Sequence, residues 1–362
     1  MTLASFEGHP TTQSNASHLL DCPSTRTFGV LATDNEHDSE DHSAPCADEF
    51  RAASVAIHSY LANPNTIPLS IPCNIGLYHR LLDEGVLLID ETAASFSYDS
   101  YRSVLRIRSY TMRIHDVPLT FISCIVFSNP TLSPLSRKIK ITGATTDFSG
   151  FSGRYKDSRK QPDVAIWTKV DYWPTVVVEA GWNEDYLNLI ADTRMWLLGG
   201  RDGDQSHAGQ VNVVILVNFT ETTSMDVDSR LGPSSGYQGD RKEKNVDCLD
   251  DSDANMQELG ARLEVWRRCN GAEDVELVQS HDFYPTNRDG GDDRMHLTVG
   301  DIIPSEYYLA QRISPSKKIL FDLDILREHI DDSIQFLSID RETTSRIKAQ
   351  KRKELLCKHT SF

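Results

Sequence analysis

The stretch Gln161–Trp182, QPDVAIWTKVDYWPTVVVEAGW, is the part of the sequence from which we predict the fold. It contains two short apolar runs, 163–167 and 175–179, separated by a polar segment centred near Asp171. Runs of this length that are rich in Val, Ile and Trp predict β-strands, and the short connection between them predicts an antiparallel hairpin.

The register of this hairpin brings two carboxylates together. With the turn centred near Asp171, Asp163 stands opposite Glu179, and the same register sets Ala165 opposite Val177. Opposed residues share one face of a sheet, and their Cβ atoms lie ~4.5–5.5 Å apart. Two carboxylates this close repel each other unless a proton or a cation lies between them. A divalent hard metal such as Mg²⁺ suits the position.

The residues that follow predict a helix and a third strand. Asn183 is a suitable N-cap for a helix over 184–198, which Gly199 and Gly200 should end. The run VNVVILVNF, 211–219, is typical of a strand covered on both faces. A strand, a helix and a strand in sequence form a right-handed crossover with parallel strands. The carboxylates should therefore lie at the open end of a mixed sheet, near a helix N-terminus that favours phosphate.

Pro162-Asp163, followed sixteen residues later by Glu179 within VVVEAG, resembles the PD-(D/E)XK, or restriction-endonuclease-like, superfamily. The stretches KIKITGATTDFSGFSGRYKDSRKQPDVAIW, VVVEAGWNEDY, DTRMWLLGG and VNVVILV are similar to a group of uncharacterised fungal proteins with that fold. The resemblance covers about 137–220 well and 263–330 loosely. It implies an α/β fold with an αβββαβ core and a mixed central sheet, followed by C-terminal strands and helices.

The resemblance also implies a metal-dependent nuclease that acts on DNA or RNA. Asp163 and Glu179 would be metal ligands for Mg²⁺ or Mn²⁺, and the Ala180 carbonyl would be a further ligand. In such sites the metal activates water and stabilises the charge that develops on phosphate.

The chain departs from the superfamily pattern at the catalytic lysine. The lysine expected two residues after Glu179 is replaced by Gly181, which has no side chain. Arg194 on the predicted helix and Lys160 just before the Pro-Asp pair are the candidate substitutes, although an arginine is a poor proton acceptor. Two functions stay open: a nuclease with a degenerate site, and a catalytically inactive nuclease-fold protein that acts as a binding or interaction module.

Length alone allows two domains or one large domain with loops, and we expect one large domain with flexible additions. Of the 362 residues, 1–46 have the composition of a disordered tail, and 221–257 are a polar, acidic insertion. The domain should span 47–340, with its core at about 75–220 and 260–335. A basic C-terminal helix or tail, 341–362, should follow.

Charge and motifs limit the partners. The net charge of −16 argues against a wholly basic nucleic-acid surface but not against a local basic groove. Seven scattered cysteines without a CxxC pair, and an N-terminus without a secretory pattern, indicate an intracellular protein of the cytoplasm or nucleus. No GxGxxG or P-loop sequence indicates a nucleotide cofactor, and no apolar run is long enough to cross a membrane. The oligomeric state stays open.

Several side chains have specific predictions. The apolar face of the 184–198 helix should consist of Leu187, Ile190 and Leu197, with Asp192 on the solvated face and Arg194 paired with a carboxylate. Trp182 and Trp196 should pack in the core. The segment 98–115 fits helix and strand equally, and its arginines would form a phosphate-facing patch if they share one side: Arg102, Arg106, Arg108 and Arg113. Further helices are predicted at 48–63, 75–85, 322–336 and 341–357, and further strands at 86–90 and 275–283; the runs 137–145 and 263–268 are ordered segments without an assigned type.

Overall fold

The hairpin predicted within Gln161–Trp182 forms in the computed structural model of the chain, with the predicted register. β7 (Val164–Thr168) runs antiparallel to β8 (Val176–Trp182), and Ala165 pairs with Val177. β8 then continues through α4 (Tyr186–Gly199) into β9 (Val213–Thr222), which pairs with β8 in parallel. The predicted strand–helix–strand crossover is therefore confirmed.

The structure describes residues 47–62, 67–87, 94–109, 116–144, 146–169, 173–182, 185–200, 210–222, 258–269, 274–285, 295–336 and 346. They belong to one compact unit. The predicted tail at 1–46, most of the predicted insertion at 221–257 and nearly all of 341–362 lie outside the described residues.

A mixed six-stranded sheet forms the centre of this unit, with the strand order β11-β10-β9-β8-β7-β4. β7 is antiparallel to both of its neighbours, and β10 is antiparallel to both β9 and β11. All seven residues of β8 are buried, as expected for a strand covered on both faces. The edge strands are β4 (Ile139–Gly143) and β11 (Val275–Tyr284), and β10 (Glu258–Arg268) lies between β9 and β11.

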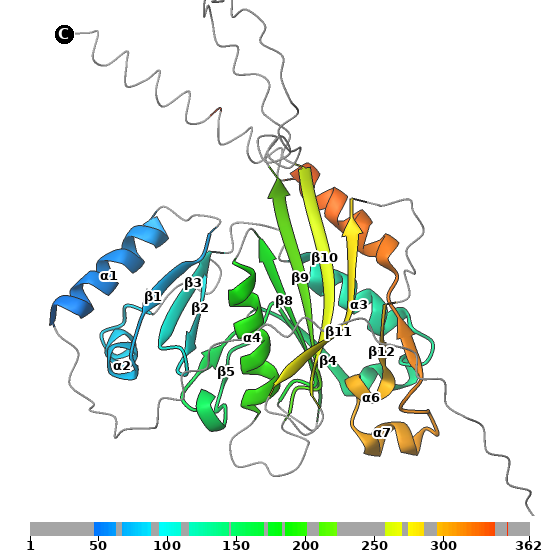
Figure 1. Cartoon of the computed structure of the whole chain (residues 1–362). Helices are drawn as coiled ribbons and strands as arrows, with labels where there is room; N and C mark the ends of the chain where they lie inside the picture. Colours follow the sequence, from blue (N-terminus) through cyan, green and yellow to red (C-terminus); the bar gives the residue numbers. More distant parts are fainter. Residues whose placement is uncertain are drawn as a thin grey trace, which may run out of the picture. The chain divides into compact units, whose positions relative to one another are not determined.

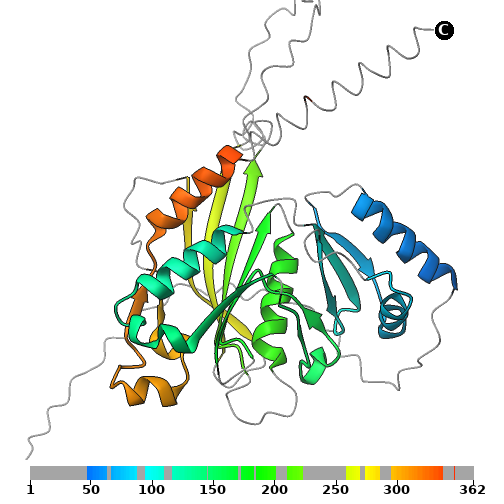
Figure 2. The same cartoon turned by 180° about the vertical axis from the view of Figure 1, so that it is seen from behind.

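Helices cover both faces of the sheet, so the fold is a three-layer α/β arrangement. α4 packs on one face, over a core that includes Ala165, Val177 and Leu216 (Figure 1). α3 (Val117–Ser128) and the helix at 323–336 pack on the opposite face, seen from behind in Figure 2. Among the described helices, none combines the length and the apolar character needed to cross a bilayer.

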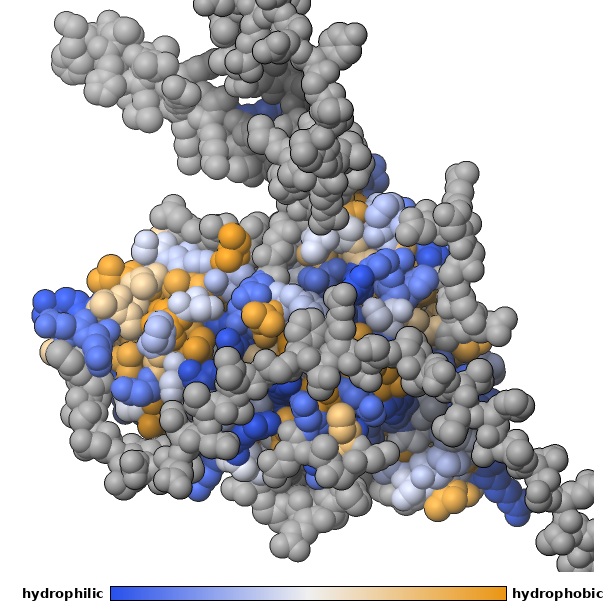
Figure 3. Space-filling view, in the orientation of Figure 1, coloured by the Kyte–Doolittle hydropathy of each residue, from blue (hydrophilic) through white to orange (hydrophobic). Residues whose placement is uncertain are grey.

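A second, smaller sheet has the order β1-β3-β2-β6-β5 and carries its own core. The apolar face of its first three strands packs against α1 and α2, and in the view of Figure 3 hydrophobic residues gather over these elements. Its elements are α1 (Ala47–Ala62), β1 (Leu69–Pro72), α2 (Ile75–Asp83), β2 (Ala94–Asp99), β3 (Val104–Ser109), β5 (Phe148–Ser149) and β6 (Arg159–Lys160).

Short elements complete the described chain. β12 and β13 form a two-stranded antiparallel sheet. These elements are η2 (Ser133–Lys138), η3 (Gly153–Tyr155), β12 (His296–Thr298), α6 (Val299–Ile302), α7 (Ser305–Ala310) and β13 (Lys318–Leu320).

Two local predictions need correction, and one segment that the sequence left undecided is resolved. Residues 84–87 form a turn after α2, so the strand predicted at 86–90 does not begin there, and 88–90 lie outside the described residues. α4 is capped by Asp185, whose side chain accepts from the Leu187 N–H; the predicted cap, Asn183, lies outside the described residues. The ambiguous segment 98–115 contains the end of β2, a turn at 100–103 and all of β3, and 110–115 lie outside the described residues.

Candidate functional site

The two predicted carboxylates lie at the same end of the β7–β8 hairpin. Val164 pairs with Val178, and the same register carried one pair outward sets Asp163 opposite Glu179. Asp163 Oδ2 accepts a hydrogen bond of 2.7 Å from the N–H of Ala180, which follows Glu179 in β8. In an extended strand the N–H and the carbonyl of one residue point to the same side, so the Ala180 carbonyl is directed toward this end as well.

Glu179 is held in a fully buried position under α4. Its Oε1 accepts a hydrogen bond of 2.6 Å from Trp196 Nε1, and Trp196 is itself fixed by ring contacts with Phe148 and Phe151. Glu179 Oε2, in contrast, has no hydrogen-bond partner among the described residues. Burial raises the pKa of Glu179 to about 7; the nearby Lys160 ammonium opposes this rise.

Lys160 approaches the carboxylates from the end of β6. Its Nζ donates to Asp192 Oδ2 at 2.6 Å and lies 3.6 Å from Glu179 Oε1. The side chain is 2% exposed, so this ammonium is buried among carboxylates. Of the two lysine substitutes predicted from the sequence, Lys160 is the one that the structure brings to Glu179.

Asp192 is a central member of the site, and its predicted place on a solvated face is wrong. It is fully buried, and it accepts hydrogen bonds from both Lys160 and Arg106. Burial favours a higher pKa for Asp192, but the two cations outweigh it and hold the pKa below its usual value. The predicted apolar face of the helix is confirmed at Leu197, which is buried, and at Ile190, which packs against the same core, but it is wrong at Leu187, which is exposed. Leu189 and Asp192 turn inward instead.

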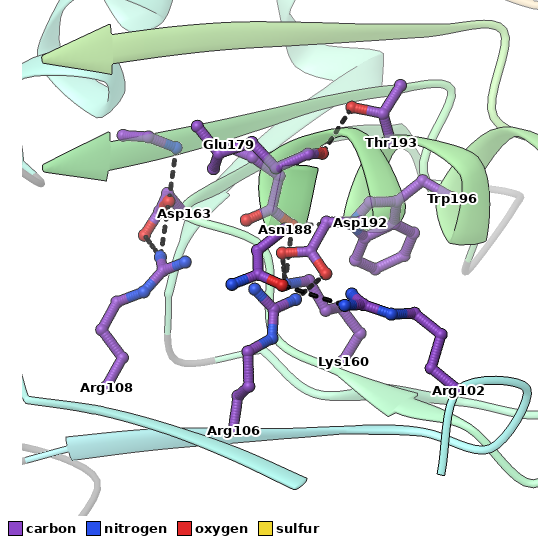
Figure 4. Close-up of polar contacts among 12 residues, drawn as sticks. Arg102, Arg106, Arg108, Lys160, Asp163, Glu179, Asn188, Asp192, Thr193 and Trp196 are labelled. Atoms are coloured by element: carbon purple, nitrogen blue, oxygen red, sulfur yellow. Dashed lines mark hydrogen bonds and ion pairs between the residues drawn. The ribbon is translucent and has the colours of Figure 1, made fainter. Parts of the chain in front are cut away.

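Two arginines of β3 face the carboxylates from the smaller sheet (Figure 4). Arg108 Nη1 donates to both oxygens of Asp163, at 3.1 and 3.0 Å, and Arg106 pairs with Asp192. Arg102 donates to Asn188 at 3.1 Å. Arg106 and Arg108 therefore share one side of a strand, as a patch requires, but that side meets carboxylates; Arg113 lies outside the described residues.

These contacts define what we call the charge cluster. It contains three carboxylates and three cations: Asp163, Glu179, Asp192, Arg106, Arg108 and Lys160. Its formal charge is zero when all six groups are ionised. A buried cluster of this kind is stable only if its charges stay paired, because a buried charge without a partner is costly.

Arg194 lies elsewhere. It is partly exposed and pairs with Asp274 at 3.3 Å, so the predicted carboxylate partner is confirmed, but Arg194 is not among the residues gathered around Glu179. Trp182 and Trp196 both pack in the core, as predicted.

The packing of α4 leaves little room for a side chain at Gly181, where the sequence resemblance predicts a lysine. A Cβ atom added to Gly181 would lie 2.6 Å from Leu189 Cδ1 and 3.2 Å from Leu189 Cγ. Leu189 is fully buried in the core between α4 and the sheet. Leu189 thus occupies the space into which a side chain at 181 would project.

The residues fit a hard divalent cation in donor chemistry. Within the described part of the chain, no group of three or more His, Cys, Asp or Glu side chains is arranged to hold a metal ion. Two carboxylates and a carbonyl nevertheless suit Mg²⁺, which keeps several waters of its own. The buried Glu179 Oε2 is an oxygen that such an ion would satisfy. Arg108 already contacts both oxygens of Asp163, so a metal there would compete with a side-chain cation.

Sequence reasoning missed Asp192 and left Arg106 and Arg108 undecided. The signal for Asp192 was its spacing of four residues from Trp196, which places both on one side of a helix. The signal for the arginines was the alternation in VLRIRS, where basic residues stand at every second position and an apolar residue stands between them.

Comparisons of the chain with protein-family models, curated proteins and solved structures found no match.

Proposed function

We propose that the chain is a metal-dependent phosphodiesterase that acts on nucleic acid, built on a restriction-endonuclease-like core. In this proposal α3, β4, β7, β8, α4 and β9 are the αβββαβ elements of that core. The order of these elements along the chain and the antiparallel setting of β7 support the assignment.

One observation carries the proposal: Asp163, Glu179 and Lys160 meet at one end of a hairpin, and one Glu179 oxygen has no hydrogen-bond partner among the described residues. Asp163, Glu179 and the Ala180 carbonyl would hold Mg²⁺ or Mn²⁺, which when bound supplies activation of water and neutralisation of charge on phosphate. A buried carboxylate oxygen without a partner is costly, so this arrangement favours a ligand at that point.

Lys160 takes the role of the missing lysine. Its ammonium already contacts carboxylates from two elements, β8 and α4, so it supplies positive charge rather than a proton acceptor. Such a charge beside the reacting phosphate stabilises the charge that develops there. Arg106 and Arg108 add positive charge on the side of β3.

The test is cleavage of duplex DNA and of single-stranded RNA by the full chain with Mg²⁺ or Mn²⁺. Asp163→Asn and Lys160→Met should each lower the rate by at least ~100-fold. Arg194→Gln is the matched control, because Arg194 pairs with Asp274 outside the charge cluster and should leave the rate unchanged. Equal rates for the parent chain and Asp163→Asn would refute the proposal.

A second function, a non-catalytic binding module, is favoured by the pairing of all six charges with one another. It predicts no hydrolysis with either metal and no change in melting temperature when Mn²⁺ is added. A thermal shift with Mn²⁺ that Glu179→Gln abolishes would argue against this module and for the metal site.

A further inference from the structure

A pocket beside the charge cluster has the chemistry of an oxyanion site. Two strands of the smaller sheet, β2 and β3, line it together with the end of β6 and the residue after it. Its polar side chains are Ser95, Ser97, Arg106, Arg108, Lys160 and Gln161. Among the described residues that line it, three carry positive charge and none is acidic.

The strand register explains how this lining arises. Ser95 pairs with Arg108 and Ser97 pairs with Arg106, so all four side chains share one face of the β2–β3 pair. The other face is apolar and packs on α1 and α2, through residues such as Leu105 and Ile107. The alternation along the two strands therefore fixes a hydroxyl beside each guanidinium.

The pocket is reachable from solvent while its cations remain shielded. Ser95, Ser97, Arg108 and Gln161 are each partly exposed, whereas Arg106 and Lys160 are buried behind them. A phosphate group is held well by guanidinium groups, which donate two parallel hydrogen bonds, and by hydroxyl and ammonium groups. The partly exposed wall and the buried cations together suit a small anion rather than a long charged surface. The cavity volume is about 10 Å³, which holds about one water, so a phosphate group enters only if Arg108 moves aside.

We propose that this pocket binds one phosphate group and that Arg108 moves between two partners, the carboxylate of Asp163 and the phosphate. The pocket does not depend on catalysis, but the movement of Arg108 rests on the metal site of the proposed function. Arg108 contacts both oxygens of Asp163, and the charge cluster sums to zero when all six groups are ionised. A divalent cation on Asp163 would leave an excess of positive charge, which a bound phosphate offsets. Metal and phosphate should therefore bind with positive coupling.

The movement of Arg108 predicts opposite effects on two ligands. Arg108→Gln removes a cation that competes for Asp163, so Mn²⁺ should bind several-fold more tightly. The same change removes a phosphate donor, so phosphate should bind at least about tenfold more weakly, the usual size for a lost charge-assisted hydrogen bond. If Arg108 had only a structural role, Arg108→Gln would lower the affinity for both ligands, because the loss of the arginine would loosen the whole site.

The experiment titrates the full chain with inorganic phosphate by calorimetry, with and without Mn²⁺, and follows free Mn²⁺ by electron paramagnetic resonance. Ser97→Ala is the second variant, because it leaves every charge of the charge cluster in place and should weaken phosphate binding alone. Arg194→Gln is the control and should match the parent chain for both ligands.

The outcomes separate this inference from the proposed function. Weaker phosphate with tighter Mn²⁺ in Arg108→Gln, and weaker phosphate alone in Ser97→Ala, support it, even if no nucleic acid is cleaved. Phosphate binding equal to the parent chain in both variants would overturn it, even if cleavage occurs. A parallel titration with a short oligothymidylate identifies the source of the phosphate, because tighter binding of the oligonucleotide than of inorganic phosphate points to a nucleic-acid backbone.

Discussion

Gly181→Ala is the change that tests most directly why this site lacks the expected lysine. The added methyl group would lie 2.6 Å from Cδ1, 3.1 Å from Cδ2 and 3.2 Å from Cγ of Leu189. Carbon atoms at contact are about 3.5–4.0 Å apart, so Leu189 must move before the methyl group fits. Leu189 is fully buried, so its movement disturbs the packing of α4 on the sheet.

The expected cost follows from these contacts. Three atoms of one side chain are too close, so a small bond rotation cannot relieve all of them, and Leu189 must leave its preferred rotamer or α4 must shift. An unfavourable rotamer costs about 0.5–1.5 kcal/mol, and overpacking a dense core costs about 1–3 kcal/mol. We therefore expect Gly181→Ala to lower the free energy of unfolding by about 1–3 kcal/mol.

Urea unfolding measures this change, with Gly143→Ala as a matched control in the same sheet. A Cβ at Gly143 has one tight neighbour, Leu119 Cδ2 at 3.2 Å, so the control should cost less than Gly181→Ala. The double variant Gly181→Ala/Leu189→Ala should lose less stability than the sum of the losses in the two single variants. The reason is that the shorter side chain at 189 no longer conflicts with the methyl group at 181. Additive losses, or a Gly181→Ala variant as stable as the parent chain, would refute the idea that Leu189 excludes a side chain at 181.

Three further predictions concern the charges around this position. Burial raises the pKa of Glu179 to about 7, so folding favours the protonated carboxyl group. As the pH rises from about 4.5 to about 7, the free energy of unfolding of the parent chain should fall by on the order of 3 kcal/mol more than that of Glu179→Gln. Identical pH profiles of unfolding in urea would contradict this. Asp192→Asn leaves two buried cations short of a partner, so we expect a loss of about 3–5 kcal/mol in the same measurement, and a loss below about 1 kcal/mol would rule out its central place. Arg194→Ala breaks only a partly exposed pair with Asp274, so its effect on stability should stay below about 1 kcal/mol, and a larger loss in thermal unfolding would count against that assignment.

The hairpin and the crossover could be predicted from the sequence because both depend on local patterns. Two apolar runs and a short turn fix the register of β7 against β8, and a strand, a helix and a strand in sequence fix the parallel pairing of β8 with β9. The place of Asp163 and Glu179 at one end follows from that register alone. These features need no knowledge of what packs on the sheet.

The charges that pair with the carboxylates could not be predicted in this way, because they come from elements far away along the chain. Arg108 meets Asp163 across 55 residues, and Arg106 meets Asp192 across 86. The sequence shows that the helix carries an aspartate. It does not show that a second sheet supplies the cations that pair with this aspartate and so allow it to be buried. The sequence alone therefore predicts a solvated Asp192, since an unpaired buried aspartate is the more costly alternative.

The glycine at 181 and the lysine at 160 are two parts of one packing arrangement. If the basic group stood on β8, its side chain would need the space in which Leu189 joins α4 to the sheet, and α4 would have to lie farther away. Moving α4 outward would also withdraw Trp196 from Glu179 and Asp192 from Lys160, because both side chains belong to that helix. Placing the ammonium on β6 instead lets α4 pack closely and still brings a positive charge within 3.6 Å of Glu179. Gly181→Lys should therefore fail to place an ammonium group beside Glu179, because Leu189 occupies the space. Replacement of Lys160 should remove the positive charge that lies there.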